Sequence, residues 1–213
     1  MPTKEDNRRV WGREWKWEGD GDEFHQFATE FGQNYDVWKS ALVKEFIDPF
    51  FGNATAIAEI GCGHGRWSNY FVGLGKQIFL QDLALECVDY CRKRFGPDAA
   101  TYITSDGDLS AIPDQGVDFI WSFDVLVHVE SADVEQYMKE IGRILKVGGT
   151  CVLHHADTNS KGHWRSDMTA LLMRDFAHRN GLVVKCQRDS FGDKYQYSVR
   201  LAGDVISIIE KFD

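Results

Sequence analysis

The chain lacks the features that would tie it to a membrane, to a polyanion or to an oxidising compartment. No apolar run approaches the ~20 residues that span a bilayer. The chain has only 24 Lys and Arg but 33 Asp and Glu, so its net charge is −9. A chain of this charge neutralises phosphates poorly. The five cysteines are odd in number and scattered, which favours reduced thiols. We therefore expect a cytoplasmic protein that binds neither nucleic acid nor membranes.

Proline is also scarce, with 4 residues among 213, and there are no repeats or low-complexity tracts. The first residues, Met1 to Arg9, are polar, so no secretory signal is expected. A hydrophobic content of 43% and a charged content of 27% are those of an ordinary globular domain. The composition predicts one domain with a full core.

Apolar runs of strand length alternate with amphipathic segments, which predicts an α/β fold with a mostly parallel sheet covered on both faces. No helix separates the last two strands, so we expect them to pair antiparallel. The predicted strands are Ala56–Ile60, Gln77–Gln81, Thr101–Thr104, Val117–Ser122, Thr150–His155, Leu182–Arg188 and Asp204–Glu210. The predicted helices are Trp67–Leu74, Leu85–Phe95, Val134–Leu145, with Asp133 as N-cap, and Thr169–Asn180, stopped by Asn180-Gly181.

The most informative motif runs from Ala56 to Trp67, where a short apolar run ends in Glu59-Ile60-Gly61-Cys62-Gly63-His64-Gly65-Arg66. Glycines allow positive φ and close approach of the backbone to a ligand, and the following amides face the turn. A second apolar run ends at Asp82, which can bind ribose hydroxyls. The pattern predicts a nucleotide-type cofactor at the carboxyl end of a strand.

Three later motifs follow in order: Asp106-Gly107 after a strand, Val117 to Asp124 as a buried strand ending in an acid, and Arg143 to Gly149 leading into Cys151–His155. With the glycine turn, they resemble class I S-adenosylmethionine-dependent methyltransferases. The resemblance implies a Rossmann-like, seven-stranded sheet with an antiparallel last strand. It also implies the cofactor-binding residues Glu59, Gly61, Gly63, Gly65, Arg66, Trp67, Asp82, Leu83, Asp106, Gly107 and Phe123.

Polar residues gather at the predicted ends of the fourth and fifth strands. Asp124 ends one, His128 follows one turn later, and His154-His155-Ala156-Asp157 ends the other. Histidine has an ordinary pKa near 6.5 and can take a hydroxyl proton at neutral pH. We predict His155 as the base, Asp124 and His128 as its catalytic neighbours, and His154 on the opposite face. Asp124, His155 and Asp157 would also suit a divalent cation such as magnesium, and sequence spacing does not decide between these readings.

A narrower resemblance rests on Trp17-Glu18 through Phe24, His64 to Trp67, Ser122 to His128, His154-His155 and Gly162 to Ser166. These segments are similar to a bacterial methyltransferase subgroup that includes saccharide O-methyltransferases. The resemblance implies O-methylation of a small polyhydroxylated acceptor, over which His163-Trp164-Arg165 would close. The alternatives are N- or carboxyl-methylation, a non-catalytic cofactor-binding subunit, or a nicotinamide-dependent oxidoreductase, which the glycine spacing disfavours.

The first 52 residues differ from the remainder, residues 53–213, which we assign to the methyltransferase-like domain. Trp11, Trp15 and Trp17 fall in a short irregular piece, and Phe24 to Phe51 carries aromatic residues at helical spacing. The segment is predicted either to cover the cofactor as a lid or to pack on the sheet or on a second subunit in a homodimer.

Overall fold

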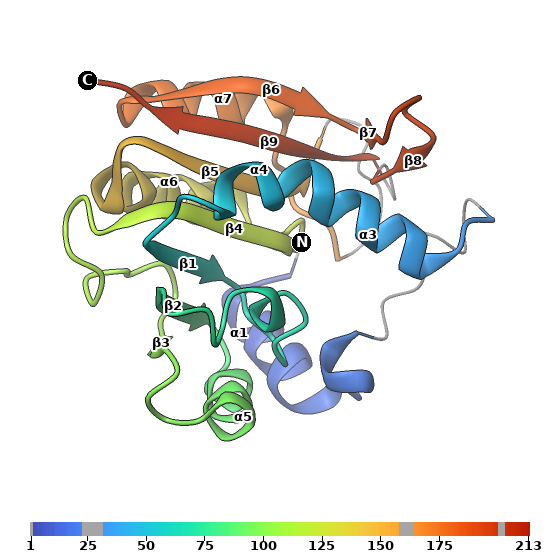
Figure 1. Ribbon diagram of the computed structural model, residues 1–213, viewed down its shortest axis with the longest axis vertical. Helices are drawn as coiled ribbons and strands as arrows, with labels where there is room; N and C mark the ends of the chain where they lie inside the picture. The colour runs from blue at the N-terminus through green and yellow to red at the C-terminus, as the bar shows by residue number, and fades with distance from the viewer. Residues whose placement is uncertain (1, 23–31, 158–163, 200–202) are drawn as a thin grey trace.

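The computed structural model describes residues 2–22, 32–157, 164–199 and 203–213. These residues form a seven-stranded sheet in the order β3-β2-β1-β4-β5-β9-β6 (Figure 1). Strands β1 to β5 pair in parallel, whereas β9 runs antiparallel to both β5 and β6. The predicted sheet and its antiparallel last strand are confirmed. The strands are β1 Ala56–Ile60, β2 Gln77–Asp82, β3 Thr101–Thr104, β4 Val117–Leu126, β5 Leu145–Ala156, β6 Leu182–Arg188 and β9 Asp204–Lys211.

The described helices are α1 Lys4–Arg9, α3 Tyr35–Phe46, α4 Asp48–Phe51, α5 Leu85–Phe95, α6 Ser131–Ile144 and α7 Ala170–Arg179. Shorter helical turns are Val10–Glu14, Gly19–Gly21 and Ser68–Tyr70, and β7 Ser190–Phe191 pairs with β8 Tyr197–Ser198. Within the described ranges, no helix is both long enough and apolar enough to cross a bilayer.

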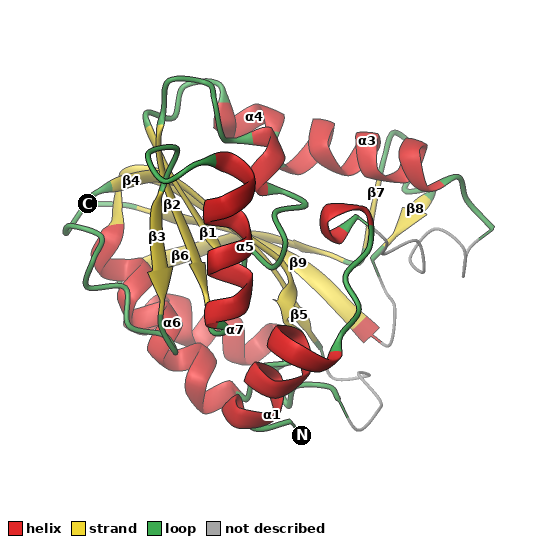
Figure 2. Ribbon diagram, turned by 90° about the horizontal axis from the view of Figure 1, so that it is seen from below, coloured by secondary structure: helices red, strands yellow, loops and turns green. Residues whose placement is uncertain are grey.

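Helices cover both faces of the sheet (Figure 2). On one face, α6 and α7 bury Met138, Ile141 and Phe176 against the strands. On the other face, Trp38 and Phe46 of α3 join the aromatic side chains of the central strands in a second core. Part of the predicted aromatic helix, residues 23–31, lies outside the described residues, whereas its later half is α3 and packs on the sheet as one alternative expected.

The predicted helix Trp67–Leu74 is wrong, because only Ser68–Tyr70 forms a single tight turn. Gly73 follows with a φ of 86°, which ends helical geometry before a second turn can form. Trp67 and Phe71 are nevertheless buried in the second core. Packing, and not helix length, therefore holds this segment in place.

The predicted N-cap of α6 is also wrong. The helix begins at Ser131, three residues before the predicted Val134, and Asp133 lies in its first turn. The backbone amide and hydroxyl of Ser131 both donate to the Asp167 carboxylate, at 2.7 and 2.8 Å, so a distant side chain supplies the cap. Asp133 instead forms an ion pair of 2.9 Å with Lys4. The stop at Asn180-Gly181 is confirmed, because Asn180 caps α7 and Gly181 has a φ of 70°.

Candidate cofactor and methyl-transfer site

The turn that follows β1 is tied to the end of β2 by hydrogen bonds. The amides of Gly61 and Cys62 both donate to the carbonyl of Gln81, at 2.8 and 2.9 Å. The amide of Gly63 donates to Oδ2 of Asp82 at 2.8 Å. Because a carboxylate has about four acceptor positions, Asp82 can fix the turn and still accept from ribose hydroxyls.

Gly61 lies where the turn comes closest to β4, and no side chain fits there. Its φ is 74°, and a Cβ at this position would lie 2.3 Å from Cγ2 of Val125. The turn therefore presents bare backbone to the pocket, with Asp82 and Asp106 among the groups that line it. A side-chain-free cradle with acids placed for a ribose and a base fits S-adenosylmethionine.

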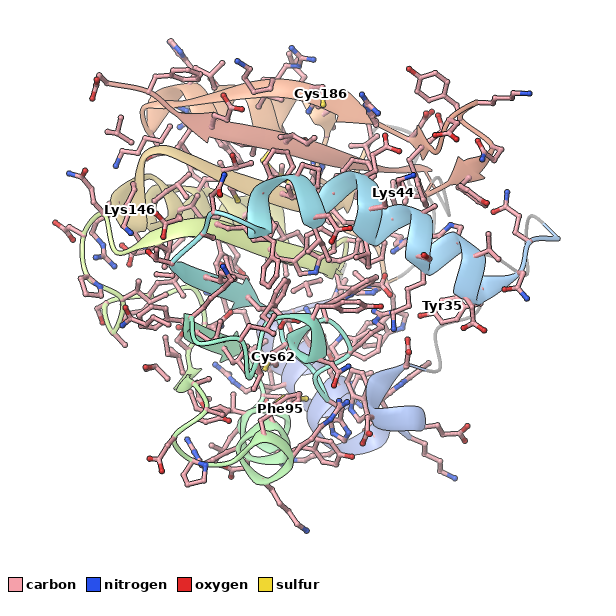
Figure 3. The ribbon with its side chains drawn as sticks, in the orientation of Figure 1. Tyr35, Lys44, Cys62, Phe95, Lys146 and Cys186 are labelled. Carbon is pink, nitrogen blue, oxygen red and sulfur yellow. The ribbon has the colours of Figure 1, made fainter. Side chains whose placement is uncertain are left out.

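Three of the predicted cofactor residues, Glu59, Gly65 and Gly107, do not line the pocket. Glu59 is buried, and the Ser68 hydroxyl donates to its Oε2 at 2.5 Å. Burial raises the pKa of Glu59 to about 8. A Cβ at Gly65 would lie 2.7 Å from the ring of Phe95, which is labelled below Cys62 in Figure 3. Glu59 and Gly65 thus support the shape of the turn from behind.

The other predicted cofactor residues line one pocket at the carboxyl ends of the central strands. Figure 1 shows α1 beside these strands. Two of the three predicted catalytic residues lie there as well. The predicted residues that line it are Gly61, Gly63, Arg66, Trp67, Asp82, Leu83, Asp106, Phe123, Asp124 and His128.

Asp124 lies where β4 bends away from β5. Its φ is 66°, a left-handed conformation that costs a non-glycine residue roughly 1–2 kcal/mol. The pairing with β5 shifts register between Ser122 and Leu126. Oδ2 of Asp124 lies 3.5 Å from Nη2 of Arg66, and the two side chains are only 8% and 9% exposed. The bend brings a carboxylate and a guanidinium together at the pocket wall.

The predicted placement of His155 is wrong, because its side chain faces away from the pocket. It is fully buried, with Nδ1 2.8 Å from the carbonyl of Ala156 and Nε2 2.7 Å from Oγ of Ser207. Burial lowers its pKa to about 4. The alternation of β5 places His154 on the opposite face of the strand, where its ring stacks on the pocket residue Phe123 with centroids 4.3 Å apart, although His154 does not line the pocket itself. Which histidine faces the site could not be read from two adjacent identical residues.

His128 lines the pocket and is oriented by a backbone carbonyl. Its Nδ1 lies 2.6 Å from the carbonyl oxygen of Trp164. A carbonyl only accepts, so Nδ1 carries the proton and Nε2 keeps its lone pair. Burial lowers the pKa of His128, although nearby Asp124 opposes the shift. A neutral imidazole at pH 7 is the form that can accept a proton.

The start of the chain lies against both ends of this pocket. Asn7 donates through Nδ2 to the carbonyl of His128 at 2.8 Å, and the ring of Trp11 lies 5.1 Å from that of His128. At the other end, Lys4 and Arg8 approach Asp106 at 3.8 and 3.7 Å. Residues of the first 22 therefore form part of the pocket wall.

The predicted metal ligands are not brought together. No group of three or more His, Cys, Asp and Glu side chains within the described parts of the chain is arranged to hold a metal ion. His155 faces Ser207, and Oδ1 of Asp157 accepts from the amide of Ala170 at 2.7 Å at the start of α7. Asp124, His155 and Asp157 therefore serve three different parts of the structure.

Some pocket residues were missed by the sequence analysis, notably Asn7, Gln81 and Tyr137. Nε2 of Gln81 donates to the carbonyl of Ser105 at 2.7 Å and lies 3.2 Å from the Tyr137 hydroxyl. Its place directly before Asp82 was the available signal. Asn7 gave no signal, because its partner His128 is 121 residues away in the sequence.

The predicted closing loop is only partly within the described residues, since His163 lies outside them. Trp164 does not line the pocket, although its carbonyl orients His128. Nη2 of Arg165 lies 2.5 Å from Oδ2 of the buried Asp204. Arg165 therefore pairs with β9 and does not face the pocket.

Comparison with known proteins identifies the central part of the chain. Residues 58–153 match a family described as a methyltransferase domain. A biotin biosynthesis bifunctional protein from Cellvibrio japonicus is 33% identical over 95 residues, covering 45% of this chain and 18% of the relative. A malonyl-[acyl-carrier protein] O-methyltransferase from Yersinia pestis is 31% identical over 93 residues, covering 44% of this chain and 33% of the relative. The matched part thus spans a third or less of these relatives.

The fold as a whole is similar to solved methyltransferases. The magnesium protoporphyrin IX methyltransferase of Synechocystis, solved with S-adenosylhomocysteine bound, superposes with a TM-score of 0.67 at 13% identity. The similarity covers 98% of this chain and 100% of that one. Residues 58–153 therefore match a methyltransferase domain, within a chain that has the fold of solved methyltransferases.

Proposed function

We propose that the whole chain is an S-adenosylmethionine-dependent O-methyltransferase that acts on a small hydroxylated acceptor. The observation that carries the proposal is a single pocket that joins the glycine turn to Asp124 and His128. One end of this pocket has the backbone cradle and acids that suit the cofactor. The other end has a neutral imidazole and a carboxylate, which suit an acceptor that must lose a proton.

At the cofactor end, the turn at Gly61 and Gly63 would receive the methionine part, Asp82 the ribose hydroxyls and Asp106 the adenine amine. When bound, S-adenosylmethionine supplies an electrophilic methyl group on a sulfonium. The chain's own residues then have to orient the acceptor, exclude water and remove its proton. Trp11 and Trp17, which also line the pocket, provide apolar cover against water.

We assign the base to His128 in place of His155. Nδ1 of His128 is held by the Trp164 carbonyl, so Nε2 is the nitrogen that can accept a hydroxyl proton. The lowered pKa keeps the ring neutral at pH 7. The nearby charge of Asp124 raises the pKa of His128 and so partly offsets the effect of burial. Asp124 would also stabilise the imidazolium that forms when His128 accepts the proton.

A saccharide-like acceptor is the finer proposal. Sugars present both C–H faces, which pack on aromatic rings, and hydroxyls, which bind carboxylates and guanidinium groups. The pocket offers both kinds of surface, with Trp11 and Trp67 as rings and Asp124 and Arg66 as polar partners. The name of the Yersinia relative supports oxygen as the methylated atom, but the free oxygen of a malonyl group belongs to a carboxylate, so this relative supports the carboxyl-methylation alternative as well.

The first half of the N-terminal segment is proposed to act as a lid. Asn7 and Trp11 contact His128 at one end of the pocket, and Lys4 and Arg8 approach Asp106 at the other. S-adenosylmethionine, bound between Asp106 and His128, would be enclosed by the same segment, together with an acceptor beside His128. Enclosure of this kind excludes water and completes the site.

The test is a methyl-transfer screen with isotopically labelled S-adenosylmethionine against sugars, phenols, amines and carboxylates, with and without magnesium. We expect transfer to a hydroxyl, independent of magnesium. His128→Asn is expected to lower kcat by ~10²–10⁴-fold, the usual size of a general-base contribution, without weakening S-adenosylhomocysteine binding. Transfer only to amines or carboxylates, or binding of S-adenosylhomocysteine without transfer to any acceptor, would contradict the proposal.

A further inference from the structure

The backbone of Asp124 depends on one side chain of the neighbouring strand. Its left-handed conformation, with a φ of 66°, is unfavourable for aspartate and persists only where surrounding contacts hold it. The Asp124 amide donates to Nδ1 of His154 at 3.1 Å. This bond crosses from β4 to β5 where their regular pairing is interrupted between Ser122 and Leu126. His154 thus replaces a backbone ladder bond at the site.

The ring of His154 is itself held on two sides. It stacks on Phe123, with centroids 4.3 Å apart and planes 18° apart. Its Nε2 lies 3.7 Å from Oδ2 of Asp204, and that same oxygen lies 2.5 Å from Nη2 of Arg165. The side chains of His154 and Asp204 are fully buried, and that of Arg165 is 11% exposed. The stack on Phe123 and the buried Asp204–Arg165 pair restrict the position of the ring.

The protonation state of His154 follows from its donor. An amide N–H can only donate, so Nδ1 must carry a lone pair and the ring proton must be on Nε2. Nε2 is the ring nitrogen nearer Asp204, whose Oδ2 lies 3.7 Å away, beyond hydrogen-bond distance. Burial and the neighbouring Arg165 lower the pKa of His154, which keeps this neutral form over the working pH range.

We propose that His154 is a positioning residue for methyl transfer: its Nδ1 holds the Asp124 amide, while the stack on Phe123 and the buried Asp204–Arg165 pair confine its ring, so that the Asp124 carboxylate is presented to the acceptor. The inference rests on the proposed function, because Asp124 matters in this way only if an acceptor binds beside it. His154 acts through Asp124 and does not line the pocket itself.

The first test does not depend on activity. NMR of protein with ¹⁵N-labelled histidine assigns the two ring nitrogens of His154, and we expect a protonated Nε2 and an unprotonated Nδ1 throughout pH 6 to 9. The Asp124 amide should be protected from hydrogen exchange in the wild type and lose that protection in His154→Leu. A protonated Nδ1, or an equally protected amide in the variant, overturns the inference even if the enzyme is active.

The second test compares three variants on the acceptor found in the screen. His154→Leu removes the acceptor nitrogen and is expected to lower kcat by ~10²-fold through misplacement of Asp124, with little change in S-adenosylhomocysteine binding. His154→Asn places an amide oxygen near the position of Nδ1 and is expected to recover most of the loss. His155→Asn, matched in strand and burial, is expected to leave kcat unchanged, because His155 faces Ser207.

The outcomes separate this inference from the proposed function. A wild type that binds S-adenosylhomocysteine but methylates nothing contradicts the proposed function, and the NMR result still decides the hydrogen bond. An active wild type with equal kcat in His154→Leu overturns the positioning role. If His154→Leu does not fold, Asp204→Asn replaces it: lost kcat with the fold and S-adenosylhomocysteine binding intact supports the proposal, and unchanged kcat contradicts it.

Discussion

Replacing Gly61 by alanine tests how closely the glycine turn packs against Val125 of β4. Two costs are expected. The φ of 74° costs an alanine roughly 1–2 kcal/mol, and a Cβ 2.3 Å from Cγ2 of Val125 forces an overpacked contact that costs about 1–3 kcal/mol more. Gly61→Ala should therefore lower the free energy of unfolding by ~2–5 kcal/mol.

Gly73→Ala is the matched control, because Gly73 has a φ of 86° but nothing within 4 Å of its added Cβ. It should lose only the backbone cost of ~1–2 kcal/mol. Val125→Ala removes the methyl groups that clash, so the double variant Gly61→Ala/Val125→Ala should regain stability relative to Gly61→Ala alone.

Urea unfolding measures the stability of all five proteins, and calorimetry measures their binding of S-adenosylhomocysteine. We expect Gly61→Ala to weaken binding and Gly73→Ala to leave it intact, because only Gly61 lines the pocket. Equal stability losses in Gly61→Ala and Gly73→Ala, or no recovery in the double variant, would refute the reasoning.

Three further predictions concern the cofactor, the proposed lid and the buried histidine. Asp82→Asn should weaken S-adenosylhomocysteine binding by ~1–3 kcal/mol, measured by calorimetry, because it impairs acceptance from both the turn and the ribose. Trp11→Ala should raise the KM for the acceptor more than Trp15→Ala does, because Trp11 lines the pocket and Trp15 does not; equal effects would argue against the lid. Folding lowers the pKa of His155 from 6.5 to about 4, so between these pH values the unfolded chain binds a proton at His155 and the folded chain does not. Relative to His155→Asn, the wild type should lose up to ~3 kcal/mol of unfolding free energy as the pH falls from 6.5 to 4, in urea titrations at fixed pH values; parallel curves would count against this.

The regular strands of the sheet were predictable because short stretches of sequence determine where they begin and end. Strands β1, β3 and β6 begin and end as predicted, since an apolar run bounded by turn residues needs no distant partner to be recognised. The glycine turn after β1 was predictable for the same reason, because Gly61, Gly63 and Gly65 all have positive φ, which glycine adopts most easily. The conformation after the turn was not predictable from the sequence. Burial of Trp67 and Phe71, and not a regular helix, holds this segment in place.

The part of the pocket around Asp124 and His128, which we propose to be catalytic, depends on contacts that sequence spacing does not encode. The choice between His154 and His155 turns on the register of β5, and a shift of one residue exchanges the two faces of a strand. The role of Trp164 is carried by its carbonyl and not by its ring. The cap of α6 came from Asp167, 36 residues away from Ser131. In each case, a contact between residues that are distant in the sequence performs the role that a local sequence feature was expected to perform.

The ion pairs at the start of the chain have a consequence for the rate of cofactor exchange. Lys4 and Arg8 hold α1 near Asp106 through partly exposed pairs, with carboxylate and cation exposures between 38% and 51%. Pairs of this kind contribute little at equilibrium and are screened when the Debye length falls to ~10 Å at 0.1 M salt. Asn7, which lies between them on α1, and Trp11, which follows the helix, contact His128 through a hydrogen bond and ring packing, which salt hardly affects. Rising ionic strength should therefore weaken the contacts of α1 with Asp106 before those with His128. Under the proposed function, in which Asp106 receives the adenine, S-adenosylhomocysteine should then leave faster.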